Sequence, residues 1–166
     1  NVGDAVMYGM ESLLDFNLRK LFSDEYTYSC NYFINVSVID SKYTQSEENG
    51  VQGNKVEFIP NFNFKTGFKF GYKNLLSSLQ YTYLSSQFTD ASNASESNLS
   101  GVIGKIPAYD VLDFSMSYSY KKAKLEWGVN NLLDKSYFTR RATGYPGPGI
   151  IPSANRNLYL SFQLKF

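Results

Sequence analysis

Residues 157–166 alternate strictly between apolar and polar side chains. One parity carries Leu158, Leu160, Phe162, Leu164 and Phe166, and the other carries Asn157, Tyr159, Ser161, Gln163 and Lys165. Successive side chains of a β-strand point to opposite faces, so this pattern predicts a strand with one apolar face and one polar face.

The same alternation recurs along the chain and predicts seven strands. They cover residues 6–18, 26–38, 61–70, 75–84, 111–120, 124–130 and 157–166. Across these segments the apolar parity is rich in aromatic rings and free of charge, whereas Asp, Glu and Lys fall on the other parity. The prediction is therefore a β-sheet with two chemically distinct faces.

The connections between these strands come in two sizes that alternate. Short connections are expected near residues 22–25, 71–74 and 121–123, and long ones at 45–55, 90–107 and 134–154, each rich in Gly, Ser, Asn or Pro. Tight turns at one end and long loops at the other describe an antiparallel, up-and-down sheet. Outer-membrane barrels have this asymmetry, with short periplasmic turns and long extracellular loops.

The aromatic content indicates which face meets lipid. The chain contains 14 Tyr and 13 Phe, and a large share of these rings falls on the apolar parity. The interior of a small barrel has room for few such rings, so we expect them to point outward. Lipid explains why that parity carries no charge, because Lys or Arg at the bilayer midplane of a barrel exterior costs about 2 to 4 kcal/mol.

Composition excludes several classes of function. The chain has no His, a single cysteine at Cys30 and a formal net charge of +1. We therefore expect no zinc, haem or other cofactor, no His-based catalysis and no nucleic-acid partner, and we predict that the protein is not an enzyme. No apolar run approaches the roughly 18 residues that a transmembrane helix needs.

Seven strands do not close the usual bacterial barrel, in which the number of strands is even. An open sheet would leave edge groups that lipid cannot satisfy. We therefore expect residues 1–166 to form the C-terminal part of a larger barrel.

Four local motifs resemble, in order, those of TonB-dependent outer-membrane receptors. They read NVGDAVMYGME at 1–11, IPAYDVLD at 106–113, GVNNLLDKSY at 128–137 and RNLYLSFQLKF at 156–166. The resemblance implies a barrel of roughly 22 strands in the bacterial outer membrane, with a plug domain and earlier strands that this chain lacks. It also implies active uptake of a scarce nutrient, coupled through the plug to an inner-membrane energy-coupling protein.

The last strand resembles the segment by which the outer-membrane assembly machinery captures a nascent barrel. Phe162, Leu164 and Phe166 would form this assembly signal. The alternative is that Phe166 is an ordinary aromatic residue of the lipid–water boundary, and both interpretations can hold together.

The segment 137–156 resembles the corresponding loop of ferric dicitrate receptors and suggests a ferric chelate ligand. Arg140, Arg141, Tyr145 and Arg156 are the candidate ligand-contacting residues, because arginine pairs with carboxylates through two parallel bonds. The alternative is that these arginines bond loop carboxylates such as Asp134, or the phosphates of lipopolysaccharide, which with the lipid bilayer is an expected partner.

Two other classes remain open on the sequence alone. One is a small, complete outer-membrane barrel of an adhesin-like kind. The other is a soluble lipid-binding β-protein, since a soluble barrel also alternates, with its apolar side inward.

Overall fold

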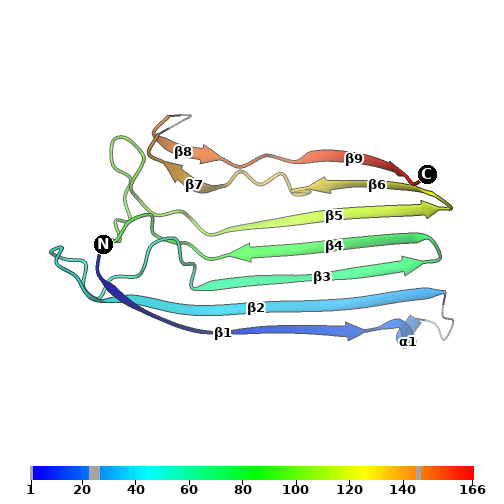
Figure 1. Cartoon of the computed structure of the whole chain (residues 1–166), viewed down its shortest axis with the longest axis horizontal. Coiled ribbons are helices and arrows are strands. Elements are labelled where there is room, and N and C mark those ends of the chain that lie inside the picture. The colour runs from blue at the N-terminus through cyan, green and yellow to red at the C-terminus, as the bar shows by residue number, and fades with distance from the viewer. Residues whose placement is uncertain (1, 23–26, 145–146) are drawn as a thin grey trace.

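In the computed structural model, which describes residues 2–22, 27–144 and 147–166, seven strands form one sheet in the order β1-β2-β3-β4-β5-β6-β9. All neighbours in it are antiparallel. The strands are β1 (Asp4–Asn17), β2 (Tyr28–Gln45), β3 (Phe62–Tyr72), β4 (Leu75–Leu84), β5 (Tyr109–Tyr120), β6 (Ala123–Asn130) and β9 (Asn157–Leu164). Figure 1 shows them side by side along the molecule.

The two ends of the sheet differ as the sequence predicted. Figure 1 places the long connections, the N-terminus and a hairpin of β7 (Phe138–Ala142) and β8 (Gly149–Pro152) at one end. The short turns, the helix α1 (Arg19–Phe22) and the C-terminus lie at the other. We call these the loop end and the turn end. In the described ranges, no helix combines the length and apolar character required to cross a membrane.

The predicted strands are confirmed, and one of them is much longer than expected. β2 continues from Val38 to Gln45, because it remains paired with β1 up to Asp4. Asp40 and Lys42 fall on the otherwise apolar parity of this extension. The alternation therefore stops where the face no longer has to be apolar, while the backbone pairing goes on.

Other elements were missed or fall outside the described residues. The segment 134–154 was expected to be a loop, but it contains the β7–β8 hairpin, and α1 occupies part of the expected turn at 22–25. These elements are too short for periodicity to reveal them. Asn1, the rest of that turn and Tyr26 lie outside the described residues.

The cross-strand register confirms the two faces. Leu125 lies opposite Phe162 and Trp127 opposite Leu160, whereas Lys124 lies opposite Gln163. Directly opposite residues share a face. Rings gather on the apolar face, where Tyr28 stacks on Tyr72 with centroids 4.6 Å apart.

The apolar face has no cover within the described chain. Leu158, Leu160 and Phe162 are 78%, 74% and 66% exposed. An apolar surface of this extent needs an apolar solvent or a partner to cover it.

Bulky side chains on the polar face cover glycines directly opposite them. A Cβ atom at Gly67 would lie 2.9 Å from the ring of Phe33, and one at Gly128 would lie 2.7 Å from the ring of Tyr159. Glycine at these positions lets the rings lie flat against the neighbouring backbone, which pins the register of the sheet.

Candidate functional site

The connections at the loop end are bonded into one layer. The Asn93 side chain donates to the Lys55 carbonyl at 2.8 Å and accepts from the Lys55 N–H at 2.7 Å. It thus bonds both backbone groups of one residue, as the backbone of a neighbouring β-strand does. Asn54 donates to the Ala91 carbonyl at 2.8 Å. These bonds tie the β2–β3 connection to the β4–β5 connection.

A small core lies beneath this layer. Tyr43, Val51 and Ala91 are buried together. The Tyr43 hydroxyl donates to the Glu57 carboxylate at 2.6 Å, and this bond, with burial, raises the pKa of Tyr43 to about 12. Tyr43 lies beyond Asp40 on β2, outside the apolar band. As in water-soluble proteins, its hydroxyl can be buried because it is hydrogen-bonded.

Arg141 fastens the β7–β8 hairpin to the same layer. Its guanidinium donates to the Gly101 carbonyl at 2.7 Å and to the Lys105 carbonyl at 3.1 Å, and the residue is 8% exposed. The structure therefore places this predicted ligand residue inside the loop packing, where it joins segments far apart in the sequence.

The other predicted ligand residues have different surroundings. Arg156 bonds Asp134, with its N–H 2.9 Å and its guanidinium 3.7 Å from the carboxylate, as the alternative interpretation expected. Arg140 is exposed on β7, and among the described residues no hydrogen bond or ion pair engages its side chain. Tyr145 lies outside the described residues. The three described candidates thus have separate surroundings.

The motif at 128–137 forms the junction where the long β6–β9 connection begins. Asn131 is 2% exposed; its amide donates to the Lys135 carbonyl at 2.8 Å and accepts from the Lys135 N–H at 2.9 Å. Its own N–H donates to Asp113 at 2.8 Å. Tyr137 stacks on Tyr109 with centroids 4.6 Å apart. This motif holds β5, β6 and the hairpin together.

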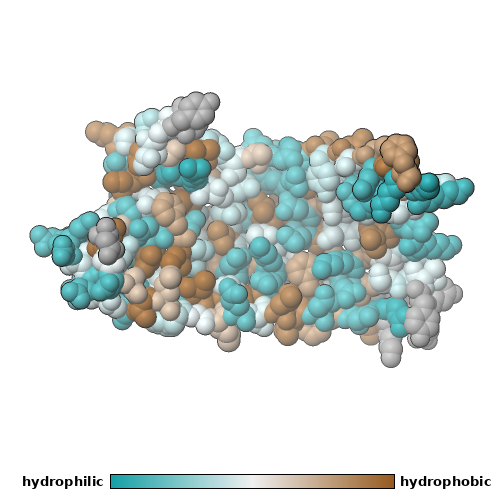
Figure 2. All heavy atoms as spheres, in the orientation of Figure 1, coloured by the Kyte–Doolittle hydropathy of each residue, from teal (hydrophilic) through white to brown (hydrophobic). Residues whose placement is uncertain are grey.

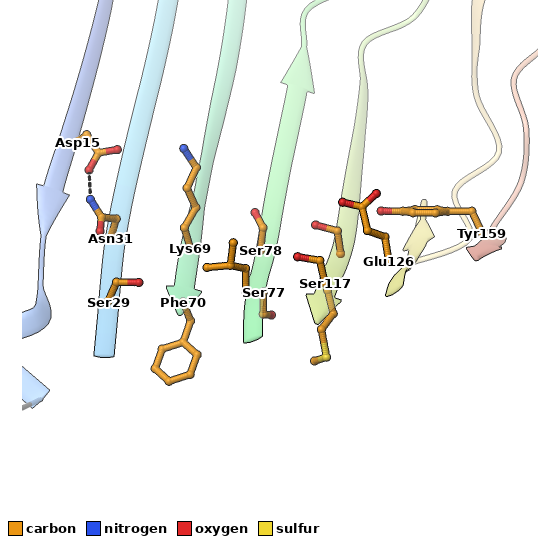
Figure 3. A pocket seen from close by; sticks show the side chains of 13 residues that line it. Asp15, Ser29, Asn31, Lys69, Phe70, Ser77, Ser78, Ser117, Glu126 and Tyr159 are labelled. Atoms are coloured by element: carbon orange, nitrogen blue, oxygen red, sulfur yellow. Dashed lines mark hydrogen bonds between the residues drawn. The ribbon is translucent and has the colours of Figure 1, made fainter. Parts of the chain in front are cut away.

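A hollow of about 570 Å³ lies on the polar face toward the turn end. Figure 3 shows its polar side chains spread over successive strands, from the bonded Asp15 and Asn31 through Lys69 to Glu126 and Tyr159. Figure 2 shows one face of the molecule with hydrophilic and hydrophobic residues mixed along the strands. This hollow is part of the polar face of the sheet, which carries both positive and negative side chains.

The acids of the polar face are engaged separately. Glu11 accepts from Ser37 at 3.3 Å and Asp15 accepts from Asn31 at 2.5 Å, so each has its own cross-strand partner. Glu126 pairs with Lys124 on the same strand. Within the described ranges, no group of three or more His, Cys, Asp or Glu is placed to hold a metal ion.

The faces, the asymmetric ends and the open edges together define a segment of a transmembrane β-barrel. A family model described as TonB dependent receptor-like, beta-barrel matches residues 1–132. The chain therefore belongs to the TonB-dependent receptor family, which comprises bacterial outer-membrane transport receptors rather than enzymes. The predicted family is confirmed.

Solved structures show the same fold at low sequence identity. The ferric citrate transporter FecA in its unliganded form matches with a TM-score of 0.86 and 23% identity, over 98% of this chain and 24% of that chain. The ferric yersiniabactin receptor FyuA from Yersinia pestis gives 0.75 and 20%, over 100% and 24%. The copper transporter OprC gives 0.73 and 18%, over 100% and 24%.

The chain thus spans about a quarter of the length of these proteins. A search of curated protein sequences gives no match. At these identities the similarity shows the fold and leaves the ligand undetermined. In the barrel, the apolar face meets lipid, the polar face meets the lumen, and the loop end is extracellular.

Sequence reasoning missed the residues that organise the loop end. Asn93 and Asn131 both have positive φ, 56° and 53°, and both use their amides to close loops. Asparagine is among the residues that tolerate this conformation. Asn93 lies in a stretch rich in polar residues, and Asn131 lies in the motif at 128–137. That signal marks a turn, but it does not say which distant segment the amide binds.

We predict that Asn131→Ala destabilises the loop end, because the backbone carbonyl and N–H of Lys135 lose their bonds to the buried Asn131 amide. The loss of a buried hydrogen-bonded amide costs about 1 to 3 kcal/mol. The measurement is urea unfolding of the intact receptor in detergent, together with proteolysis within 131–156. Asn130→Ala is the control, since Asn130 is exposed and bonds only the Asn157 side chain among the described residues. Equal effects of the two changes would contradict the assigned role.

Proposed function

We propose that this chain is the C-terminal barrel segment of a receptor that takes up an anionic ferric chelate such as ferric citrate. The observation that carries the proposal is the exposed guanidinium of Arg140, on a hairpin that the buried Arg141 holds in the extracellular layer. Similarity in fold to the ferric citrate transporter FecA supports this ligand class. FyuA and OprC have the same fold but are described as a ferric yersiniabactin receptor and a copper transporter.

The four candidate residues then divide by role. Arg140 offers the planar fork of donors that suits a carboxylate. Arg141 and Arg156 fix the loop that presents it, through backbone carbonyls and Asp134 respectively. Tyr145, which lies outside the described residues, remains a proposed contact. A rigid loop layer lowers the entropic cost of holding the ligand.

Transport would require parts that lie outside this chain. In the proposed receptor a plug domain fills the lumen and links it to the inner-membrane energy-coupling protein. The mixed charges of the lumen wall, such as Lys69 and Glu126, suit contact with a polar plug surface.

We also propose that β9 is the closing strand and carries the assembly signal. Within the described chain, β9 pairs with β6 alone, so its other edge is available to a further strand. Phe162 and Leu164 are exposed on its apolar parity, and Phe166, two residues beyond the strand, is exposed as well. A free backbone edge beside an apolar face is what strand addition by an assembly machine requires.

For the ligand, we predict that Arg140→Gln weakens ferric citrate binding by the intact receptor about three- to tenfold. A charge-assisted bond contributes about 1.5 to 3 kcal/mol, less when exposed to water, and about 1.4 kcal/mol corresponds to a factor of ten. Isothermal titration in detergent at two salt concentrations measures the loss and its electrostatic share.

Lys105→Gln is the matched control, because it removes one positive charge from the same loop layer, where its ammonium lies 5.5 Å from the Phe88 ring centre. Wild-type affinity in Arg140→Gln would remove Arg140 from the site. A preference of the wild-type receptor for a neutral ligand would overturn the substrate class.

For assembly, we predict that Phe166→Ser lowers the amount of folded receptor in the outer membrane and leaves the ligand affinity of the assembled fraction unchanged. Gln163→Ser, on the luminal parity of the same strand, is the control. Folded receptor is measured by surface labelling. If Phe166→Ser and the control reach equal abundance, Phe166 is an ordinary boundary aromatic.

A further inference from the structure

Two connections at the loop end touch at a pair of glycines, Gly101 and Gly149. Gly101 lies in the β4–β5 connection and Gly149 begins β8, and Figure 1 shows both connections at the loop end. A Cβ atom at Gly101 would lie 3.3 Å from the Gly149 Cα, and one at Gly149 would lie 3.3 Å from the Ser100 carbonyl oxygen. Glycine at both positions thus lets two backbones, far apart in the sequence, lie in direct contact.

The backbone conformation at this crossing also favours glycine. The φ angle is 71° at Gly101 and 122° at Gly149, values that residues with a side chain rarely adopt. Gly149 pairs with Ala142 across the hairpin, and both residues are buried. The crossing is therefore an internal contact of the loop layer, and at each of its two positions a side chain would meet both strain and crowding.

The β4–β5 connection holds its side of the crossing by its own bonds. The Asn98 carbonyl accepts from the Gly101 N–H at 2.9 Å, and the Asn98 side-chain oxygen accepts from the Ile103 N–H at 3.2 Å. Nearer the sheet, Gln87 and Ile106 exchange two backbone bonds of 3.1 and 2.8 Å, and Ile106 is 1% exposed. The connection thus offers the hairpin a backbone surface of fixed shape.

Arg141 secures the crossing from the hairpin side. Its guanidinium bonds the Gly101 and Lys105 carbonyls, and the guanidinium carbon lies 5.2 Å from the Phe138 ring centre. Successive side chains of a strand point to opposite sides, so the buried Arg141 directs its neighbour Arg140 away from the layer. The crossing therefore determines the direction in which the Arg140 guanidinium is presented.

We propose that the β4–β5 connection and the β7–β8 hairpin form one body that positions Arg140, and that Gly101 and Gly149 are the positioning residues that join its two parts. The body stays joined while the receptor captures its ligand. A hairpin that moved alone would have to break both Arg141 bonds and separate the two backbones at the crossing. The role of Arg140 in this proposal rests on the proposed function, whereas the joining of the two parts is measured without ligand.

The first experiment measures hydrogen exchange of the intact receptor in detergent, without ligand. In Gly101→Ala we expect amides of β7 and β8 to exchange about tenfold faster, because the added Cβ pushes the hairpin away. The matched control is Gly50→Ala, since Gly50 also has a positive φ of 82° but a Cβ there would meet no atom within 4 Å. The control adds backbone strain without crowding, so we expect wild-type exchange in the hairpin.

The reciprocal variant reads the same contact from the other side. Gly149→Ala places a Cβ against the Ser100 carbonyl, and we expect faster exchange in residues 98–106 of the β4–β5 connection. When ferric citrate is added to the wild-type receptor, we expect exchange in this connection and in the hairpin to slow together. Unheated electrophoretic mobility verifies that each variant is folded.

The second experiment is a double-mutant cycle on ferric citrate binding, measured by isothermal titration. Alone, Gly101→Ala should weaken binding about three- to tenfold, which is the cost of ordering one long side chain on binding. In the Arg140→Gln background it should cause little further loss, because the guanidinium that it misplaces is already absent. A purely structural role would give the same loss in both backgrounds.

The proposal is overturned if Gly101→Ala leaves hairpin exchange at the wild-type rate, or if Gly50→Ala accelerates it equally. Additive losses in the cycle, or ligand protection of the hairpin alone, would also overturn it. A wild-type receptor that does not bind ferric citrate would contradict the proposed function, and the exchange of the glycine variants would still decide whether the two connections form one body.

Discussion

The structure depends on one constraint, which is that lipid offers no hydrogen-bond partner to an unpaired backbone group. Every strand must therefore pair on both sides within the band, and the face toward lipid must be apolar. Residues 31–38 of β2 meet both demands, because they pair with β1 on one side and with β3 on the other and keep one apolar parity. About 9 to 11 residues suffice for a tilted strand to cross. Within the described chain β1 and β9 have one neighbour each, so the sheet has to continue into a larger barrel.

Outside the lipid band the chain is stabilised as water-soluble proteins are, by buried groups that are hydrogen-bonded. Side-chain amides, a buried guanidinium and a buried tyrosine hydroxyl bind connections that have little apolar core of their own. Each of these buried polar groups is hydrogen-bonded to a loop, and these bonds also fix the loop shape. The loop end is therefore specified by polar contacts, whereas the barrel wall is specified by alternation and cross-strand packing.

This difference explains what could be predicted from sequence. Period-2 alternation revealed the strands and faces, because lipid imposes it residue by residue, and the observed pairing of Leu125 with Phe162 places both on the predicted apolar face. The same signal ended at Val38, where the lipid demand ends, and so it missed the rest of β2. Arg141 was predicted to contact the ligand because a guanidinium pairs well with anions. Its burial against two backbone carbonyls depends instead on a loop some 40 residues away in the sequence. No local pattern encodes such a contact.

The odd and even positions of β6 and β9 face different solvents, the lumen and the lipid. The most direct measurement is a spin-label scan of residues 158–163 in the intact receptor in bilayers, comparing collisions with oxygen and with a water-soluble nickel complex. We predict that labels at 158, 160 and 162 favour oxygen, and that labels at 159, 161 and 163 favour nickel. Equal accessibility at both parities, or nickel access at 160, would contradict it.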